Sequence, residues 1–379
     1  MTDPPLIYLD HNATTPVAPE VLRAMLPYLQ DRFGNPSSGH AKGTEAAAAI
    51  RRARDELAGL LNADPDEVIF TSGGTEADHL ALLGALGARG IAGTHVVTTA
   101  IEHPAVLEPL RALRGHGLRL TEVAPRPDGV VAADAVLDAV TPDTAMVSVM
   151  LANNEFGTLQ PVAEIARALR DRGILIHTDA AQAVGKISVD VRALGVDLLS
   201  LAGHKLYAPK GIGALWVRRG TPLTPLLRGG GQEHGLRPGT EPVPGIVALG
   251  AAAALAASTG LTAATEIARL RDRLEAALTS RLGRVTITGR DAARLPGTSH
   301  LRIDGVPGAE LLSRIPELAA STGSACHTGG ASPTLAAIGL DAARAAEALR
   351  LSLGTGTTAE EVQSATDLLS EHADLIRAR

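Results

Sequence analysis

The stretch Gly195-Val196-Asp197-Leu198-Leu199-Ser200-Leu201 is an apolar run of the kind that forms buried strands, and it leads into Ala202-Gly203-His204-Lys205. Most lysines lie at protein surfaces, because a charged amine is costly to bury. A lysine at the end of a buried strand instead enters the crevice where open α/β sheets bind ligands. A second apolar run, Gly173-Ile174-Leu175-Ile176-His177-Thr178, ends at Asp179 in the same way. The two runs predict that Lys205 and Asp179 lie on neighbouring strand ends.

This pair of side chains suits one cofactor in particular. Pyridoxal phosphate (PLP) needs a carboxylate beside its ring nitrogen and an amine that forms a Schiff base with its aldehyde. Asp179 and Lys205 supply these two groups. An isolated aspartate is also a common helix N-cap, so this alternative stays open for Asp179.

Apolar strand-like runs alternate with amphipathic helical stretches over most of the chain. The expected strands are Val68–Phe70, His95–Thr99, Arg119–Val123, Ala145–Leu151, Ile174–Thr178, Leu198–Leu201 and Gly213–Val217. The expected helices between them are Thr44–Leu61, Thr75–Ala88, Val106–Arg114, Ala132–Val140 and Pro161–Arg172. This alternation predicts an α/β fold with a mostly parallel seven-stranded sheet that helices flank.

The pattern changes at about Pro244, where a long alanine-rich helix begins that continues to Leu282. The elements expected after it are strands Val285–Thr288 and Ser299–Ile303, a helix Gly308–Ile315 and a last helix from Thr358. We therefore expect a large α/β domain over residues 16–253. Residues 1–15 and 254–379 are expected to form a smaller α+β domain.

Composition limits the classes of protein and partner. The 379 residues are 45% hydrophobic with a net charge of −6, and acidic and basic residues are interspersed, which predicts no nucleic-acid surface. No secretory signal is recognisable, and the weakly polar stretch from Ile246 to Ser258 is too short to span a bilayer. A single cysteine excludes an internal disulfide framework and a multi-cysteine metal site. We expect a cytoplasmic protein without a metal or a membrane partner.

The turn Thr71-Ser72-Gly73-Gly74-Thr75-Glu76-Ala77 follows an expected strand and opens an expected helix. Glycines let the backbone approach a ligand closely, and a helix N-terminus offers free N–H groups to an anion. The turn is therefore a candidate phosphate site. An ordinary glycine-rich turn with a threonine cap is the alternative.

Two further polar turns follow expected strands. His103, in Ile101-Glu102-His103-Pro104-Ala105, is a candidate to stack on the cofactor ring or to transfer a proton, since the chain has few aromatic residues. Asn153-Asn154-Glu155-Phe156-Gly157 offers amides that orient a cofactor oxygen or a substrate group, and Gln182 offers another. Plain polar loops are the alternative in each case.

Two side chains near the end of the chain are candidates for substrate chemistry. Cys326 lies among serine, glycine and threonine residues and is followed by His327, which makes its thiol a candidate nucleophile rather than a core residue. Arg350 lies in the apolar run Ala348-Leu349-Arg350-Leu351-Ser352, where a guanidinium needs a partner. A substrate carboxylate binds such a fork through two bonds, and a structural ion pair is the alternative.

Together these motifs resemble the NifS/IscS-type cysteine desulfurases, which are class-V aminotransferases of PLP fold type I. The resemblance covers essentially the whole chain. It includes Tyr8-Leu9-Asp10-His11-Asn12-Ala13-Thr14-Thr15-Pro16, Phe33-Gly34-Asn35-Pro36-Ser37-Ser38, Gly229-Gly230-Gly231-Gln232-Glu233 and Arg237-Pro238-Gly239-Thr240-Glu241 in addition to the segments above.

The resemblance implies a PLP site. Lys205 forms the Schiff base, Asp179 holds the pyridine nitrogen and His103 stacks on the ring. The implied cofactor contacts are Gly74, Thr75, Glu76, His103, Asn154, Asp179, Gln182, His204, Lys205 and Thr240, of which Thr240 comes from the partner subunit of a homodimer.

It also implies a reaction. The catalytic residues are Lys205, His103 and Cys326, and the substrate L-cysteine contacts Asn154, Arg350 and Asn35. Cys326 attacks the substrate sulfur, which leaves a persulfide and releases L-alanine. The persulfide is then passed to an acceptor protein, such as an iron–sulfur scaffold or a sulfur carrier.

The chain departs from the family pattern at three places. Ala202 stands where the family commonly has serine, and Ser324-Ala325-Cys326-His327-Thr328 replaces the more usual Ser-Ala-Cys-Thr-Ser. Both features are similar to selenocysteine lyases. The chain ends at Arg379, short of the C-terminal extension by which some members dock scaffold proteins. The alternatives are a selenocysteine lyase or another C–S lyase of this fold, a plain aminotransferase, and a catalytically silent sulfur-relay scaffold.

Overall fold

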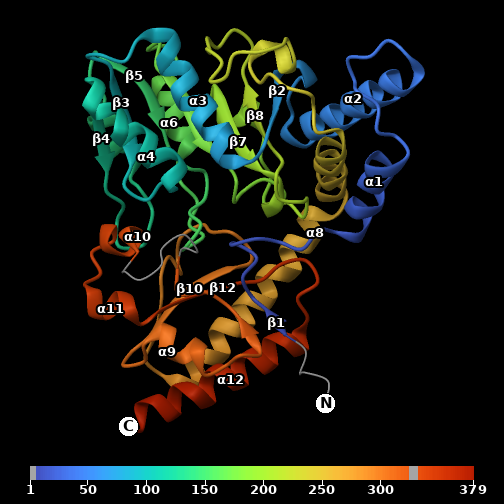
Figure 1. Ribbon diagram of the computed structural model, residues 1–379. Coiled ribbons are helices and arrows are strands. Elements are labelled where there is room, and N and C mark those ends of the chain that lie inside the picture. Colours follow the sequence, from blue (N-terminus) through green and yellow to red (C-terminus); the bar gives the residue numbers. More distant parts are fainter. Residues whose placement is uncertain (1–5, 324–331) are drawn as a thin grey trace.

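Seven strands form the central sheet in the order β2-β8-β7-β6-β5-β3-β4. They are β2 (Val68–Thr71), β3 (His95–Thr99), β4 (Arg119–Val123), β5 (Thr144–Ser148), β6 (Leu175–Asp179), β7 (Leu198–Ala202) and β8 (Gly213–Val217). All neighbouring strands are parallel except β8, which is antiparallel to both β7 and β2. The predicted mostly parallel seven-stranded sheet is confirmed in this computed structural model, which describes residues 6–323 and 332–379 (Figure 1).

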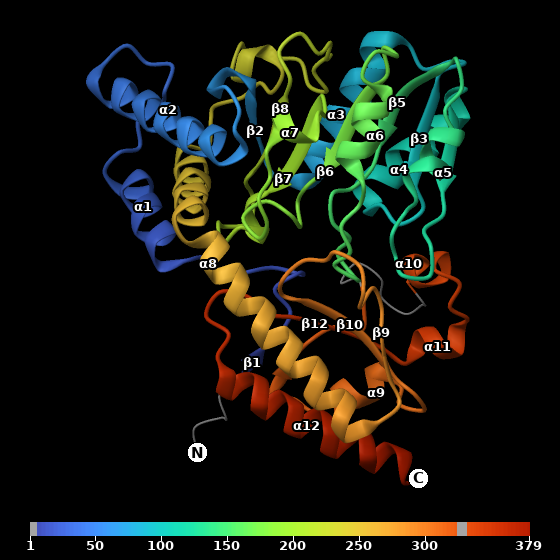
Figure 2. The ribbon, with the colours of Figure 1, turned by 180° about the vertical axis from the view of Figure 1, so that it is seen from behind.

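Helices cover both faces of this sheet, as Figures 1 and 2 show from opposite sides. The helices of this part of the chain are α1 (Pro19–Gln30), α2 (Ala41–Leu61), α3 (Gly74–Arg89), α4 (Pro104–Leu113), α5 (Ala133–Asp138), α6 (Val162–Leu169) and α7 (Val191–Leu194). Short 3-10 turns are η1 (Pro65–Glu67), η2 (Arg114–His116), η3 (Gly203–Lys205) and η4 (Glu233–Gly235).

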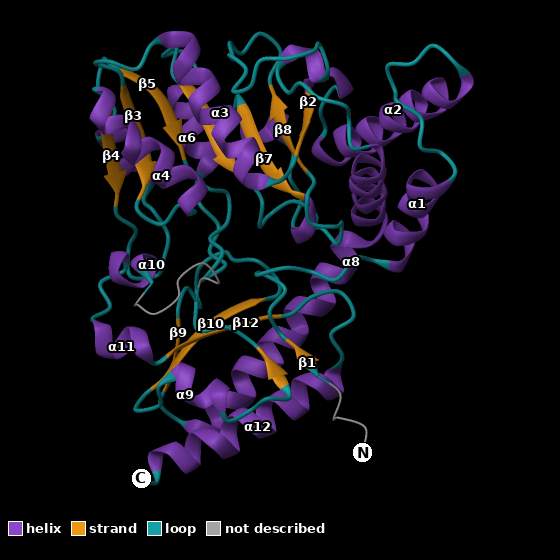
Figure 3. Ribbon diagram, in the orientation of Figure 1, coloured by secondary structure: helices purple, strands orange, loops and turns teal. Residues whose placement is uncertain are grey.

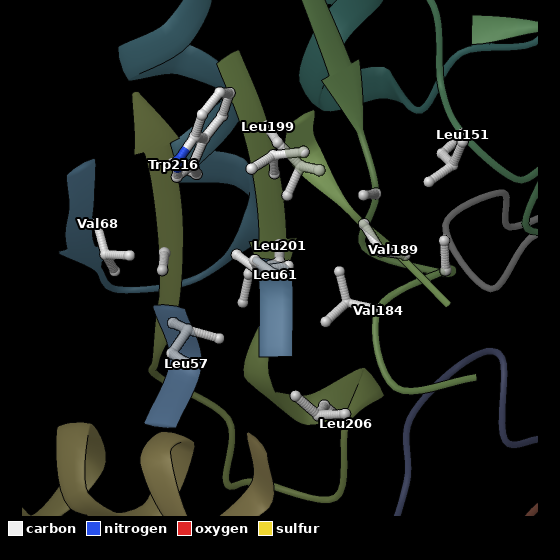
Figure 4. Packing of buried hydrophobic residues seen from close by; sticks show 14 of the residues in the cluster. Leu57, Leu61, Val68, Leu151, Val184, Val189, Leu199, Leu201, Leu206 and Trp216 are labelled. Carbon is white, nitrogen blue, oxygen red and sulfur yellow. The ribbon is translucent and has the colours of Figure 1, made fainter. Parts of the chain in front are cut away.

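Alternate strand residues divide into two buried clusters, one on each face. Ile69 and Leu198 pack with α3 and α4 on one face, whereas Phe70 and Leu199 pack with α2 and α6 on the other. Figure 4 shows part of the second cluster, where Trp216 of β8 lies in the same core as residues of α2. Because side chains alternate along a strand, a sheet buried on both faces requires the continuous apolar runs of this sequence.

The remaining elements form a second layered body, drawn below the large sheet in Figure 3. Its antiparallel sheet has the order β12-β10-β9, and β1 pairs with β11 in a separate parallel ladder. The elements are β1 (Ile7–Tyr8), β9 (Val285–Ile287), β10 (Thr298–Ile303), β11 (Leu318–Ala319), β12 (Ala348–Ser352), α9 (Gly308–Ser313), α10 (Pro333–Ala337), α11 (Ala342–Ala346) and α12 (Ala359–Arg377). Its own buried cluster joins Leu9 from the start of the chain with leucines such as Leu301, Leu349 and Leu369.

The helix α8 (Val243–Leu282) belongs to both bodies. Its first half contributes Ile246 and Leu249 to the core beside α2, and its second half contributes Leu274 to the core beside α12. The side chains of Ser258 and Thr259 both donate to the Leu255 carbonyl in the middle of the helix, where Figure 2 shows that its axis bends. Val243–Gly260 is also apolar enough to cross a membrane by composition alone, a test that core helices pass as well.

Candidate active site

A cavity of about 220 Å³ lies at the carboxyl ends of β6 and β7, where the two bodies meet. Open α/β sheets bind their ligands at such strand ends. The residues that line it are Asn12, Ala13, Gly74, Thr75, Asp78, His103, Met150, Ala152, Asn154, Asp179, Ala181, Gln182, Ala202, His204, Lys205 and Arg350. The structure thus brings together most of the residues that the sequence predicted.

Lys205 ends the 3-10 turn η3, which follows directly after β7. Its Nζ donates to the carbonyl oxygens of Asn12 at 2.6 Å and Ala13 at 2.7 Å. Thr15 fixes the same turn, since its backbone N–H and its hydroxyl both donate to the His204 carbonyl. The segment around Asn12, which precedes Lys205 by nearly two hundred residues in the sequence, therefore binds the reactive amine directly.

Asp179 ends β6 with only 7% of its surface exposed. Burial raises the pKa of its carboxyl, and the neighbouring His103, the Ala181 N–H and Lys205 act in the opposite direction. Its Oδ1 accepts the Ala181 N–H at 2.8 Å in a local turn, and no helix begins here, so the N-cap alternative is not what the structure contains. A cationic ring nitrogen is a suitable partner for a carboxylate in this position.

The start of α3 forms the other end of the cavity. Gly74 and Thr75 open this helix of 16 residues, whose first N–H groups and positive dipole end favour an anion. Gly213 of β8 packs against the turn so closely that an added Cβ would meet the Gly73 backbone at 2.6 Å. The close approach of strand and turn fixes where the helix starts.

Two histidines are held in defined orientations beside the cavity. His103 caps α4, because its Nδ1 accepts the Ala105 N–H at 3.1 Å, which leaves the ring proton on Nε2. His204 Nδ1 lies 3.1 Å from the Thr14 hydroxyl. Burial first, then Lys205 and other cations, lower the pKa of His204 to about 4. His204 is therefore a neutral hydrogen-bonding partner for a phosphate.

Arg350 of β12 is almost completely buried and points at the cavity from the smaller body. One of its terminal nitrogens donates to Asp10 at 2.7 Å and the other donates to the Asn154 carbonyl at 3.2 Å. Its Nε has no acceptor among the residues that the structure describes. Arg350 thus forms the structural ion pair that the sequence left open and still keeps a buried donor for a carboxylate.

Several buried titratable groups in the cavity wall and behind it were not predicted. Glu102 Oε1 accepts the Thr99 hydroxyl and the Met150 N–H, both at 2.8 Å, and burial raises the pKa of Glu102 to about 8. Asp78 lies 3.6 Å from His177 Nε2. Burial raises the pKa of Asp78 well above its ordinary value and lowers the pKa of His177 to about 3, so burial disfavours the charged form of both groups. No local sequence pattern signals such groups.

Three predicted contacts lie outside the cavity lining. Glu76 accepts the Ser72 N–H at 2.7 Å and pairs with Arg237 at 3.0 Å, so its carboxylate stabilises the turn rather than a ligand. Asn35 is exposed and accepts the Ser37 N–H, and Thr240 lies on an exposed loop. Cys326 lies outside the described residues.

Asn12 is the main functional residue that the predictions missed. Its carbonyl accepts from Lys205 and Gln182, and its Nδ2 donates to the Asn154 carbonyl and to Thr298. The signal in the sequence was the polar run Asp10-His11-Asn12-Ala13-Thr14-Thr15, which follows a short strand as the other site segments do.

The residues present fit PLP. The start of α3 suits a phosphate, Asp179 suits a pyridinium, and Lys205 places an amine in the same cavity, where it interacts favourably with Asp179. Asn154 and Gln182 supply amides on the cavity wall between these groups and Arg350.

Comparisons with known proteins agree with this geometry. The model of the family "Aminotransferase class-V" matches residues 7–364. A cysteine desulfurase from Trichormus azollae is 42% identical over 98% of this chain and 94% of its own length. A solved structure of a NifS-like protein covers 98% of this chain and 100% of its own, with 34% identity and a TM-score of 0.92. A structure of SspA in complex with cysteine covers 91% of this chain and 98% of its own, with 36% identity and a TM-score of 0.81.

Proposed function

The chain belongs to the class-V aminotransferase family, and we propose from this premise that it is a PLP-dependent cysteine desulfurase. It removes sulfur from L-cysteine, releases L-alanine and passes the sulfur from Cys326 to an acceptor protein. The observation that carries the proposal is the cavity that unites Lys205, Asp179 and the start of α3 with Arg350. Similarity to cysteine desulfurases over nearly the whole chain supports it.

Enzymes of this family depend on PLP in general. Here Lys205 would hold the aldehyde, Asp179 the ring nitrogen, and Gly74, Thr75 and His204 the phosphate. His103 would contact the ring, and Gln182 and Asn154 would offer it their amides, since all three residues line the same cavity. Bound PLP supplies an electron sink for bonds at the α-carbon of an amino acid.

The substrate is bound by charge and by hydrogen bonds. Arg350 receives the carboxylate of L-cysteine, since its Nε is a buried donor without an acceptor among the described residues. The structure of SspA with cysteine supports cysteine as the substrate class. Once its amine is released, Lys205 moves protons at the α-carbon, and His103 Nε2 is a second proton donor.

The sulfur transfer itself is assigned to Cys326. Its thiolate forms a bond to the substrate sulfur, and the substrate C–S bond breaks with its electron pair left on carbon. Protonation of that carbon completes L-alanine, and Cys326 retains a persulfide. Contacts of the flanking residues support this role: Ser321 pairs with Arg350, and Ser332 donates to Glu155 at 2.6 Å, next to Asn154.

The assembly and setting are part of the proposal. We propose a cytoplasmic homodimer in which the exposed Thr240 and Asn35 reach the cavity of the partner subunit. The position of Thr240 on an exposed glycine-containing loop supports this arrangement. An iron–sulfur scaffold or a sulfur carrier is the proposed acceptor.

One experiment tests the core of this function. The purified protein is loaded with PLP and incubated with L-cysteine, and released alanine is measured together with the mass of the Cys326 peptide. We expect alanine and a mass increase of one sulfur on Cys326, and neither with Lys205→Ala. Cys326→Ala should lose turnover of cysteine. If Cys326→Ala instead retains full turnover, or only selenocysteine is consumed, the cysteine desulfurase assignment is wrong.

A further inference from the structure

Lys186 lies in the wall between the active-site cavity and a second cavity of about 550 Å³. It lines the second cavity, which is mostly apolar and lies between the segment after Asn12 and the bend of α8. Its Nζ donates to Gln182 Oε1 at 2.7 Å and to Asn12 Oδ1 at 3.2 Å. Both acceptors belong to residues that line the active-site cavity.

The Lys186 amine donates to one oxygen of each amide, and this contact decides how the two amides are turned. With Oε1 of Gln182 facing Lys186, its Nε2 is directed at the Asn12 carbonyl, to which it donates at 2.9 Å. With Oδ1 of Asn12 facing Lys186, its Nδ2 donates to the Asn154 carbonyl and to Thr298. A flip of the Gln182 amide would set two carbonyl oxygens against each other.

The surroundings of Lys186 exclude an ordinary structural ion pair. Within residues 6–323 and 332–379, no carboxylate forms a salt bridge with it. The charged and titratable groups that interact with it are His11, His204, Lys205 and Arg350. Burial first, then Lys205 and Arg350, lower the pKa of Lys186 well below its ordinary value. Keeping an amine here costs free energy that no opposite charge offsets.

We propose that Lys186 is a positioning residue for the cysteine desulfurase reaction, acting through Gln182 and Asn12. It fixes the Gln182 amide with its N–H groups toward the Asn12 carbonyl and the cofactor cavity. The same carbonyl receives the Lys205 amine at 2.6 Å, so Lys186 also sets the place from which Lys205 acts. This inference rests on the proposed function and adds a residue to it.

The test uses the PLP-loaded protein and reads the pH at which its visible absorbance band titrates, without substrate. In Lys186→Met the amide of Gln182 is free to turn and a nearby amine is lost. Both changes remove stabilisation of the deprotonated cofactor–lysine linkage, so the midpoint should rise by about one pH unit. Lys186→Arg, which keeps a donor, should stay within about 0.3 units of wild type. Lys210→Met, an exposed lysine outside this contact, is the matched control and should behave like wild type.

A double-mutant cycle decides whether Lys186 acts through Gln182. In a Gln182→Met background, Lys186→Met should raise the midpoint by less than about half of what it adds in the wild-type background, because the amide that it orients is gone and only the loss of the nearby amine remains. If Lys186→Met retains PLP poorly, the dissociation constant of PLP replaces the midpoint in the same cycle. Additive effects, or an unchanged midpoint in Lys186→Met, overturn the proposal. A wild-type protein without a visible band would instead overturn the proposed function.

Discussion

Arg350 is the largest completely buried side chain among the residues that the structure describes, and it is held by Asp10 and the Asn154 carbonyl. A planar guanidinium binds a protein carboxylate on one side and a substrate carboxylate on another, which a single ammonium does not do. Under the proposed function, the ion pair to Asp10 therefore holds the guanidinium in place for the substrate carboxylate and does not compete with it. This proposed arrangement leads to the first prediction.

Arg350→Lys should raise the KM for L-cysteine at least about tenfold, because a single ammonium does not keep the contacts to Asp10 and Asn154 and also supply the donor that Nε offers to the substrate carboxylate. Turnover of cysteamine, which lacks the carboxylate, should fall much less. Steady-state kinetics with both thiols measure this difference. An equal loss with the two substrates would mean that Arg350 acts through the fold alone.

Glu102 gives a pH-dependent prediction, since burial raises its pKa from 4.5 to about 8. Between these values the folded protein keeps a proton that the unfolded chain releases. The stabilisation linked to this proton is complete below pH 4.5 and is lost as pH rises toward 8, at about 1.4 kcal/mol per pH unit. Glu102→Gln keeps an oxygen acceptor for Thr99 and Met150 but does not titrate.

The measurement is the free energy of unfolding of both proteins in denaturant between pH 5.5 and 7.5. The difference between Glu102→Gln and wild type should move in favour of the variant by about 3 kcal/mol over this range. At pH 5.5 the remaining difference between the two free energies of unfolding reflects the amide NH₂ of the variant. This group replaces Oε2, an atom without a partner among the described residues. A difference that stays constant with pH would show that Glu102 is ionised in the folded protein.

The start of α3 is the element on which cofactor affinity should depend most. Gly213→Ala adds a Cβ that meets the backbone of Gly73 at 2.6 Å, so the turn before α3 must shift. N–H groups that bind a phosphate tolerate little displacement, and we expect the dissociation constant of PLP to rise at least about tenfold. Equilibrium dialysis measures it. Gly59→Ala on α2, a position where an added Cβ meets no atom and where φ is not left-handed, controls for the exchange of glycine for alanine as such.

Elements with a strong local pattern were predicted well from the sequence. β3, β4 and β8 match the predicted bounds. β3 and β8 are buried on both faces, and such a run has no other stable place in this fold, whereas β4 is a partly exposed strand at the edge of the sheet. Other elements differ from the predictions for reasons that the hydrophobic pattern does not contain. α2 begins at Ala41 instead of Thr44, since His40 caps it through Gly43. The helix α1 was not predicted at all, because Pro27 interrupts its interior.

The position of a site residue was predictable from the sequence where that residue lies at or just after the end of a buried strand. Lys205 and Asp179 follow buried runs, so their neighbourhood followed from sheet geometry. Asn12 and Lys186 depend on a contact between the start of the chain and residues beyond 180, which no local periodicity encodes. The raised pKa of Glu102 likewise results from burial in the folded protein, which no local pattern encodes.

The two bodies of the molecule are joined by one long helix and by the segment around Asn12. Leu9 packs in the smaller core, and a few residues later Thr15 bonds the turn of Lys205 in the larger one. Asn12 lies between them and touches both Thr298 and Asn154. A shift of one body against the other would therefore move the carbonyls that hold Lys205, which ties the reactive amine to the arrangement of the whole chain.

The proposed homodimer requires an interface between its subunits, and the exposed side of α1 is a candidate for it. This helix packs Val21 and Tyr28 inward and leaves Leu22, Leu26 and Leu29 exposed along its outer side. An apolar row of this kind on a protein surface is typical of an interface. If it is covered in the dimer, Leu26→Glu with Leu29→Glu buries two charges and removes apolar contact, so the dissociation constant should rise at least about hundredfold.

Sedimentation equilibrium over a range of concentrations measures this change. The control is Leu375→Glu on α12, an exposed leucine at the opposite end of the molecule from α1, which should leave the dimer intact (Figure 1). Because Thr240 is proposed to reach the partner's cavity, the α1 variant should also release PLP more readily on dilution, although neither leucine lines the cavity. A double variant that sediments like wild type would place the dimer interface elsewhere, and a monomeric wild type that retains PLP would contradict the role of Thr240.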